Sequence, residues 1–266
     1  DRALRAQPVT TGTTGLILTA LTGIPAVQPG DHLTTLLGDA LARQAQPPKH
    51  HDVLVVSQKI VSKAEDRYIS LCDVKPSSKA QQLGRETDKD PALIELILRE
   101  SRAIVRHRPG LVISEHNLGM VMANAGIDQS NVTDDGRGPR VLLLPRDPDG
   151  SSAALRSALG QRFGVELGVI IADSAGRAWR HGITGMALGA AGLPALMDLR
   201  GQPDLEGRPL AVSLTGFADQ IASAAQLLMG EGAEGQPAVW IQGLSWQGEN
   251  NAARDLIRPP EQDLFR

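Results

Sequence analysis

Residues 168–185, GVIIADSAGRAWRHGITG, constrain the fold of this chain more than any other stretch. Four apolar residues lead directly into Asp173, and the cationic Arg177 and Arg180 follow shortly afterwards. A continuous apolar run of this kind is typical of a buried strand. A carboxylate at the end of such a strand, close to cations, can place a metal ligand beside a phosphate-binding surface. The alternative is a buried strand whose aspartate caps a turn.

The rest of the chain alternates strand and helix patterns, which predicts an α/β class with mixed α+β character. Strands are expected at residues 16–21, 52–57, 111–115, 141–144, 210–214 and 238–242. Helices are expected at residues 34–44, with Asp31 as N-cap, at 80–108 with a break near Asp90, at 151–163 and at 218–229. The Gly- and Ala-rich run after Gly185 suits close backbone packing.

The domain boundaries follow from composition. Residues 1–14 are predicted to be a loose N-terminal tail, residues 15–246 the folded domain, and residues 247–266 a polar, loose C-terminal tail. We find no internal repeat and no linker. The chain begins without Met, so a removed leader or tag is an expectation here.

Composition excludes several classes of function. Aromatic residues make up only 3% of the chain and the net charge is −3, which argues against nucleic-acid binding and against recruitment to an anionic membrane. The apolar run at residues 15–27 is too short to span a bilayer. The lone Cys72 excludes an internal disulfide framework and a cysteine zinc site, which suits the reducing cytoplasm.

Three acidic residues share one sequence context, because each follows a regular element next to glycine. They are Asp128 in NAGIDQSN, Asp173 in IIADSAG and Glu231 in LLMGEG. Mg²⁺ is usually held by one or two carboxylates together with substrate phosphates. Three carboxylates that meet in the fold could therefore hold one or two divalent ions. Each of them alone is more simply explained as an ordinary turn residue.

Several known motifs are absent or misplaced. The loop GEGAEG at residues 230–235 matches G-x-G-x-x-G, but it follows a helix and precedes a strand, which argues against a Rossmann dinucleotide site. The loop can still offer backbone N–H groups to a phosphate, or it can simply end the helix. No P-loop motif, H-E-x-x-H or G-x-S-x-G is present. Lys63 stands where a lysine could meet a phosphate, although a solvated surface lysine is the simpler interpretation.

The motifs together resemble the coenzyme F420-0:γ-glutamyl ligase family. They are GIPAVQPGDHL, VVSQKIVSKAED, SEHNLGMVMANAGIDQSNV, LLPRDPDGSS, IIADSAGRAWRHGITGMALGAAGL and LLMGEG followed by PAV. They occur in family order across roughly residues 16–244. Two positions depart from the family pattern: Gln58 stands where a small hydroxyl residue is usual, and His32 where a second Asp is frequent.

The resemblance implies a family-specific α/β fold, neither Rossmann nor P-loop, in an intertwined homodimer. It implies GTP-dependent addition of L-glutamate to the deazaflavin coenzyme precursor through a γ-linked amide, with two Mg²⁺ or Mn²⁺ ions and K⁺. It assigns the metal site to Asp128, Asp173, Ser174 and Glu231, with Asp128 and Asp173 as catalytic residues. It assigns the nucleotide contacts to Ile24, Pro25, Ala26, Val27, Gln58, Lys63, Asn131, Met229, Gly230, Gly232, Ala233, Glu234, Gly235 and Gln236.

The implied reaction is chemically reasonable. Phosphoryl transfer from GTP to a carboxylate would give an acyl phosphate, which the glutamate amine then attacks. Positioning and charge neutralisation suffice for such a transfer. Arg177 and Arg180 are our candidates for holding substrate carboxylates or phosphates, with surface salt bridges as the alternative. Two other functions stay open: a non-catalytic nucleotide- or deazaflavin-binding protein of the same fold, and a metal-dependent phosphohydrolase.

Overall fold

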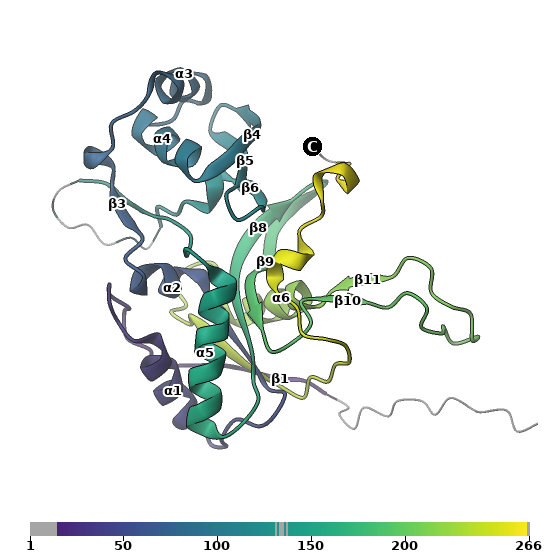
Figure 1. Ribbon diagram of the computed structural model, residues 1–266. Coiled ribbons are helices and arrows are strands. Elements are labelled where there is room, and N and C mark those ends of the chain that lie inside the picture. The colour runs from purple at the N-terminus through teal and green to yellow at the C-terminus, as the bar shows by residue number, and fades with distance from the viewer. Residues whose placement is uncertain (1–14, 131, 133–135, 137, 265–266) are drawn as a thin grey trace, which may run out of the picture.

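The protein has a mixed α/β fold, as the sequence predicts. The computed structural model describes residues 15–130, 132, 136 and 138–264 (Figure 1). None of the helices in this part of the chain is long and apolar enough to cross a membrane. The elements are β1 (Ile17–Ala20), α1 (Leu33–Ala42), β2 (Val53–Ser57), α2 (Gln58–Ala64), β3 (Tyr68–Ser70), α3 (Ser78–Thr87), α4 (Pro91–Arg99), β4 (Ser101–Arg108), β5 (Leu111–His116), β6 (Val121–Ala123), β7 (Arg140–Leu142), α5 (Pro148–Phe163), β8 (Gly168–Arg177), β9 (Arg180–Ala191), β10 (Leu196–Asp198), β11 (Leu214–Gly216), α6 (Phe217–Met229) and β12 (Ala238–Gln242).

The main sheet has the strand order β1-β12-β2-β8-β9. Only β2 and β8 run parallel, from the pair Val53–Gly168 to the pair Ser57–Ala172, while every other neighbour in this sheet is antiparallel. A sheet with a single parallel pair differs from the doubly wound parallel sheet of a Rossmann fold. The prediction that GEGAEG lies between a helix and a strand is confirmed, because it connects α6 to β12.

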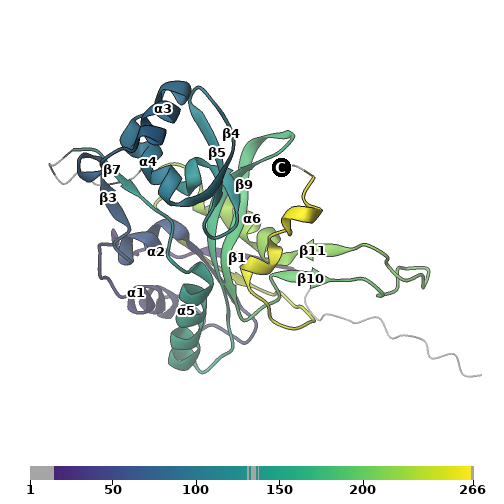
Figure 2. The ribbon, with the colours of Figure 1, turned by 45° about the horizontal axis from the view of Figure 1, so that its top comes forward.

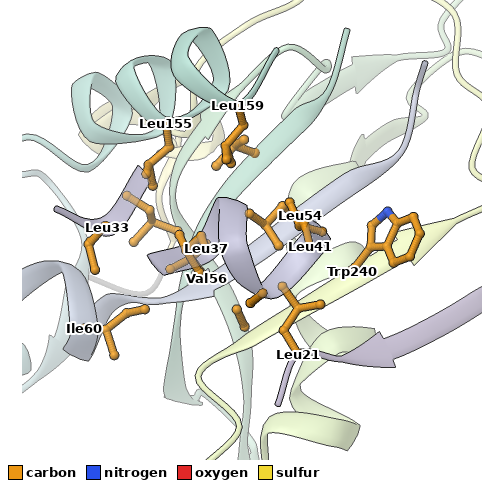
Figure 3. Close-up of a cluster of buried hydrophobic side chains, with 14 of the residues drawn as sticks. Leu21, Leu33, Leu37, Leu41, Leu54, Val56, Ile60, Leu155, Leu159 and Trp240 are labelled. Carbon is orange, nitrogen blue, oxygen red and sulfur yellow. The ribbon is translucent and has the colours of Figure 1, made fainter. Parts of the chain in front are cut away.

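Both faces of the sheet are buried, which explains the continuous apolar runs in β2 and β8. On one face Leu54 and Val169 pack against α1, α2 and α5 (Figure 3). On the other face Val55 and Ile170 pack against α6. Because successive side chains of a strand point to opposite faces, a strand covered on both sides needs apolar residues at every position.

A second group of elements stands beyond one end of the main sheet (Figures 1 and 2). It contains α3 and α4, which share an apolar cluster with Val112 of β5 and Val141 of β7. The antiparallel strands β4, β5 and β6 form its sheet. The β10–β11 hairpin projects away from the body in both views.

Three local predictions were wrong. Residues 101–108 form strand β4 rather than the end of a helix, because the turn at Gly110, with φ of +82°, folds them back onto β5. The strand expected at residues 210–214 overlaps β11 at a single residue. Helix α1 starts after His32, and Asp31 instead accepts a hydrogen bond from the backbone N–H of Gln28.

The C-terminal segment is anchored to the body, although its polar composition predicted a loose tail. Ala253 is buried, and its N–H donates to the carboxylate of Asp149, which also pairs with Arg254 at 3.0 Å. Asn251 exchanges side-chain hydrogen bonds with the backbone of Leu196. The part of this segment that the structure describes therefore belongs to the folded body, and the boundary at residue 246 stays a prediction.

The close packing predicted after Gly185 is confirmed in β9. A Cβ atom at Gly185 would overlap the backbone of Ala222 in α6, and one at Gly189 would overlap the backbone of Pro148 in α5. These glycines let two helices approach the strand directly.

Replacing Gly185 with alanine should lower the free energy of unfolding by about 1–3 kcal/mol, because the added methyl group cannot fit without moving α6. Thermal and urea unfolding measure the loss. The matched control is Gly176→Ala on β8, where a Cβ atom would meet nothing within 4 Å. Equal stability of the two variants would refute this packing.

Candidate functional site

The candidate site lies at the carboxyl ends of the parallel strands β2 and β8, where open α/β sheets usually bind ligands. Strand β8 delivers Asp173 and Ser174 immediately after its last pair with β2. Helix α2 begins at the same edge, and its N-cap Ser57 accepts a hydrogen bond from the N–H of Lys59. Two chain segments therefore bring polar groups to one point.

Asp173 is electrostatically unfavourable in its ionised form. Desolvation by the surrounding protein raises its pKa to about 6, and the neighbouring carboxylates of Asp128 and Glu231 contribute to the rise. The N–H of Ser174, at 2.8 Å, and the charge of Lys59 oppose it. Asp173 thus lies where a bound cation would be stabilised.

Asp128 is held by a network of its own. Its Oδ2 lies 2.7 Å from Nζ of Lys59, and its Oδ1 accepts hydrogen bonds of 2.7 Å from both N–H and Oγ of Ser130. Nζ of Lys59 also lies 3.0 Å from Oγ of Ser130. The ammonium group therefore sits among oxygen atoms, as a bound cation would.

Glu231 completes the acidic set from the end of α6. Its Oε1 accepts a hydrogen bond of 2.6 Å from Nε2 of Gln226, and its Oε2 accepts one of 3.0 Å from Oγ of Ser174. Gly230 ends the helix with φ of +69° and directs Glu231 towards β8. Ser174 of β8 thereby links two of the acids, because its N–H donates to Asp173 and its hydroxyl donates to Glu231.

The three predicted acids share one cavity of about 290 Å³, which is lined by Asp128, Asp173, Ser174 and Glu231 among others. The sequence therefore correctly predicted that the segments carrying these three acids meet in the fold. Within the described ranges, no group of three or more His, Cys, Asp or Glu side chains is arranged closely enough to hold a metal ion. The metal assignment of these residues stays a prediction.

A neighbouring cavity of about 380 Å³ opens beside the same acids. Asp173, Ser174 and Glu231 line both cavities. Most of the predicted nucleotide contacts line the second one, namely Ile24, Pro25, Ala26, Val27, Lys63, Met229, Gly230, Gly232, Gly235 and Gln236. Burial lowers the pKa of Lys63, the nearby charge of Lys59 lowers it further, and Asp128 raises it.

The Gly-rich loop already binds an anionic group of its own. The backbone N–H of Gly232 donates to Oε2 of Glu234 at 2.8 Å. Ala233 and Glu234 are exposed and do not line the cavity wall. The loop therefore shows that its backbone can bind a carboxylate oxygen, which resembles a phosphate oxygen in charge and geometry.

The remaining predicted residues lie elsewhere. Gln58 is buried, accepts a hydrogen bond from Oγ of Ser62 and lines the acidic cavity rather than the larger one. Asn131 falls outside the described residues. Arg177 and Arg180 face each other at the exposed tip of the β8–β9 hairpin and line neither of the two cavities. The proposed substrate contacts of these four residues stay predictions.

Lys59 is the residue that sequence reasoning missed. It lines both cavities and is the cation nearest to Asp128. Its spacing of four residues from Lys63 was a usable signal, because residues four apart share one face of a helix. The spacing could not show that Lys59 contacts Asp128, because the two residues meet only in the tertiary fold.

Comparisons with known proteins agree with these observations. Residues 23–243 match the sequence pattern of the family described as F420-0:Gamma-glutamyl ligase. The chain is 43% identical over 244 residues to the coenzyme F420:L-glutamate ligase of Methanopyrus kandleri, covering 90% of this chain and 93% of the relative. It is 42% identical over 254 residues to that of Methanothermobacter thermautotrophicus, covering 95% and 99%. It is 36% identical over 253 residues to that of Haloarcula marismortui, covering 93% and 94%.

Replacing Asp173 with asparagine should stabilise the fold at neutral pH. The pKa of Asp173 is about 6 in the folded chain, above its usual 3.8. The folded chain therefore binds the proton more tightly than the unfolded chain, and this stabilisation is fully present below pH 3.8 and is lost as the pH rises through 6. The free energy of unfolding of the variant, relative to that of wild type, should therefore rise by on the order of 2 kcal/mol as the pH is raised from about 4 to about 7.5. Urea unfolding at both pH values measures the gain.

The matched control for this experiment is Asp198→Asn. Hydrogen bonds from Arg200 lower the pKa of Asp198 to about 2, so its stabilising effect is present above 3.8 and lost at lower pH. Between pH 4 and pH 7.5 the stability difference between this control and wild type should therefore change little, and it should shrink only below about pH 4. A pH-independent difference between Asp173→Asn and wild type would show that Asp173 is not desolvated.

Proposed function

The chain belongs to the F420-0:Gamma-glutamyl ligase family, and from that premise we propose that it joins L-glutamate to a deazaflavin coenzyme precursor through a γ-linked amide, at the expense of GTP. The observation that carries this proposal is the sharing of Asp173, Ser174 and Glu231 between two adjoining cavities. One cavity offers a glycine-rich loop to a nucleotide and the other offers a concentration of negative charge. Transfer of a phosphoryl group from one to the other would take place at their boundary.

The proposed reaction balances in two steps. An oxygen of the acceptor carboxylate attacks the γ-phosphorus of GTP, so that a P–O bond forms and the bond to GDP breaks. The amine of glutamate then attacks the resulting acyl phosphate, an amide forms, and inorganic phosphate and a proton leave. Neither step requires a protein nucleophile, because the chain needs only to position the reactants and neutralise charge.

The nucleotide would lie in the cavity of about 380 Å³. The N–H of Gly232, which binds Glu234 here, would bind a phosphate oxygen instead. Lys63 lines the same cavity and would face the phosphates as a point charge. The apolar turn formed by Ile24 and Val27 would contact the base or ribose.

We propose that divalent ions bind at this boundary together with the phosphates of the nucleotide, which would complete their ligands. Asp128, Asp173, Ser174 and Glu231 offer only oxygen atoms, which Mg²⁺ and Mn²⁺ prefer. When bound, such ions supply neutralisation of the charge on the transferring phosphoryl group. We also propose K⁺ as an activating ion.

Two further properties belong to the proposal. We expect an intertwined homodimer, for which the exposed β8–β9 hairpin is a suitable contact, since Trp179 is 86% exposed and Ile183 is 51% exposed. We expect a cytoplasmic enzyme, in keeping with a single, exposed Cys72.

Mass spectrometry of the product tests the reaction. Incubation with F420-0, glutamate, GTP and Mn²⁺ should increase the mass of the precursor by one glutamyl residue per addition, and release of phosphate should require both glutamate and precursor. Asp173→Asn should lower the rate by about a hundredfold or more, because the charge of that carboxylate is lost. Glu206→Gln, at an exposed position away from both cavities, is the matched control and should react like wild type.

The other outcomes identify the alternatives. Tight binding of the precursor without a gain in mass would indicate a binding protein. Release of phosphate without glutamate would indicate a phosphohydrolase. Normal turnover by Asp173→Asn would refute the role of the acidic cavity.

The homodimer is tested by sedimentation. Replacing Trp179 with glutamate should convert dimers to monomers, because a charge would enter an apolar contact. Leu205→Glu, at an exposed apolar position in the β10–β11 connection, is the control and should leave the dimer intact. A wild-type chain that sediments as a monomer at every concentration would contradict the proposal.

A further inference from the structure

The largest volume among the described cavities belongs to neither part of the site discussed so far. It measures about 580 Å³ and lies along the outer edge of β9, which is the edge strand of the main sheet. The loop between β5 and β6, the starts of α5 and α6, and the C-terminal segment surround it. Its volume is in the range of cavities that bind medium-sized organic ligands.

Aspartate side chains accept hydrogen bonds from backbone N–H groups along the free edge of β9. This edge therefore forms one wall of the cavity and is not open to pairing with another strand there. The N–H of Ala187 donates to Asp219 at 2.8 Å, and the N–H of Ala190 donates to Asp149 at 2.9 Å. Because these acids satisfy backbone donors, β9 does not present its full edge to another strand at these positions. The wall is therefore suited to a small ligand.

The inner surface of this cavity is apolar and adaptable. Met120 and Met186 line it together with Leu118, Leu188 and Leu256. Thioether side chains adjust their shape and make favourable contacts with aromatic rings. A flat aromatic ligand suits such a surface better than a sugar or a peptide does.

The rim of the cavity carries charges of both signs, with four arginines and four aspartates in its lining. Asp149 binds two backbone N–H groups and Arg254, and Asp147 caps α5 by accepting from Gly150. Arg102 and Arg258 are exposed at the rim. Arg102 lies 3.8 Å from Glu115 and donates to the carbonyl of Asn117, whereas Arg258 pairs with no acid among the described residues. These two guanidinium groups can bind a phosphate or a carboxylate.

The cavity adjoins the acidic site directly. Met186 of β9 lies opposite Asp173 of β8 in the antiparallel register, and directly opposed residues lie side by side on one face of a sheet. Strand β6 forms a partition, because Val121 lines the large cavity while Met122 lines the acidic one. A ligand in the large cavity could therefore extend a tail to Asp173.

We propose that this cavity binds the acceptor substrate: the aromatic ring system lies against Met120 and Met186, an anionic group lies near Arg258 and Arg102, and its terminal carboxylate reaches the acidic cavity. This inference rests on the proposed function, since it assigns the flavin-like acceptor of that reaction to a place in the fold. The nucleotide, the acidic centre and the acceptor then occupy three adjoining cavities in that order.

The intrinsic fluorescence of F420-0 provides the test, with the full chain and without GTP or glutamate. Arg258→Glu, at the rim, and Met120→Trp, which fills the interior, should each weaken binding of F420-0 by about tenfold or more. The affinity for GTP should stay unchanged, because neither residue lines the nucleotide cavity. Arg85→Glu, an equal charge reversal on the surface of α3, should bind F420-0 like wild type.

Unaltered binding of F420-0 by both cavity variants, with wild type still making the glutamylated product, would overturn this inference alone. A wild-type chain that neither binds F420-0 nor increases its mass would overturn the proposed function as well. Loss of GTP affinity in parallel with F420-0 affinity would indicate general damage to the fold and would contradict a separate acceptor site. Arg258 is exposed, so its variant tests the assignment even if Met120→Trp does not fold.

Discussion

The structure depends on the parallel pairing of β2 with β8. This pair is buried between α1, α2 and α5 on one face and α6 on the other, so its backbone polar groups must be satisfied within the sheet. Where the pairing stops, at Ser57 and Ala172, one strand turns into a helix and the other continues to Asp173. The site is thus a consequence of where two buried strands separate.

The second constraint is electrostatic. Desolvation and two neighbouring carboxylates disfavour the charge of Asp173, and Lys59 offsets this only in part because it is bound closely to Asp128. Such a site costs stability in the absence of a positively charged partner, and functional sites commonly contain groups with shifted pKa values for this reason. The proposed phosphoryl transfer requires positive charge at that same place.

Much of the site could be predicted from the sequence, because elements that end in Asp or Glu next to glycine were correctly expected to meet. The pattern could not predict that β4 would be a strand, since its residues continue the composition of α4 and only the turn at Gly110 separates them from β5. Nor could it place Lys59 against Asp128, or fold Glu234 back onto Gly232, because these contacts depend on tertiary geometry. The fold class and the acidic residues of the site were therefore predictable, whereas the residues that contact those acids were not.

We infer that Asp128, Asp173 and Glu231 act as one electrostatic unit. NMR titration of the side-chain carboxyl of Asp173 tests it most directly, in wild type and in a variant that combines Asp128→Asn with Glu231→Gln. We expect a pKa of about 6 in wild type and a lower pKa in the variant, which stays above 3.8 because desolvation remains. The same pKa in both proteins, or a wild-type pKa at the usual 3.8, would contradict it.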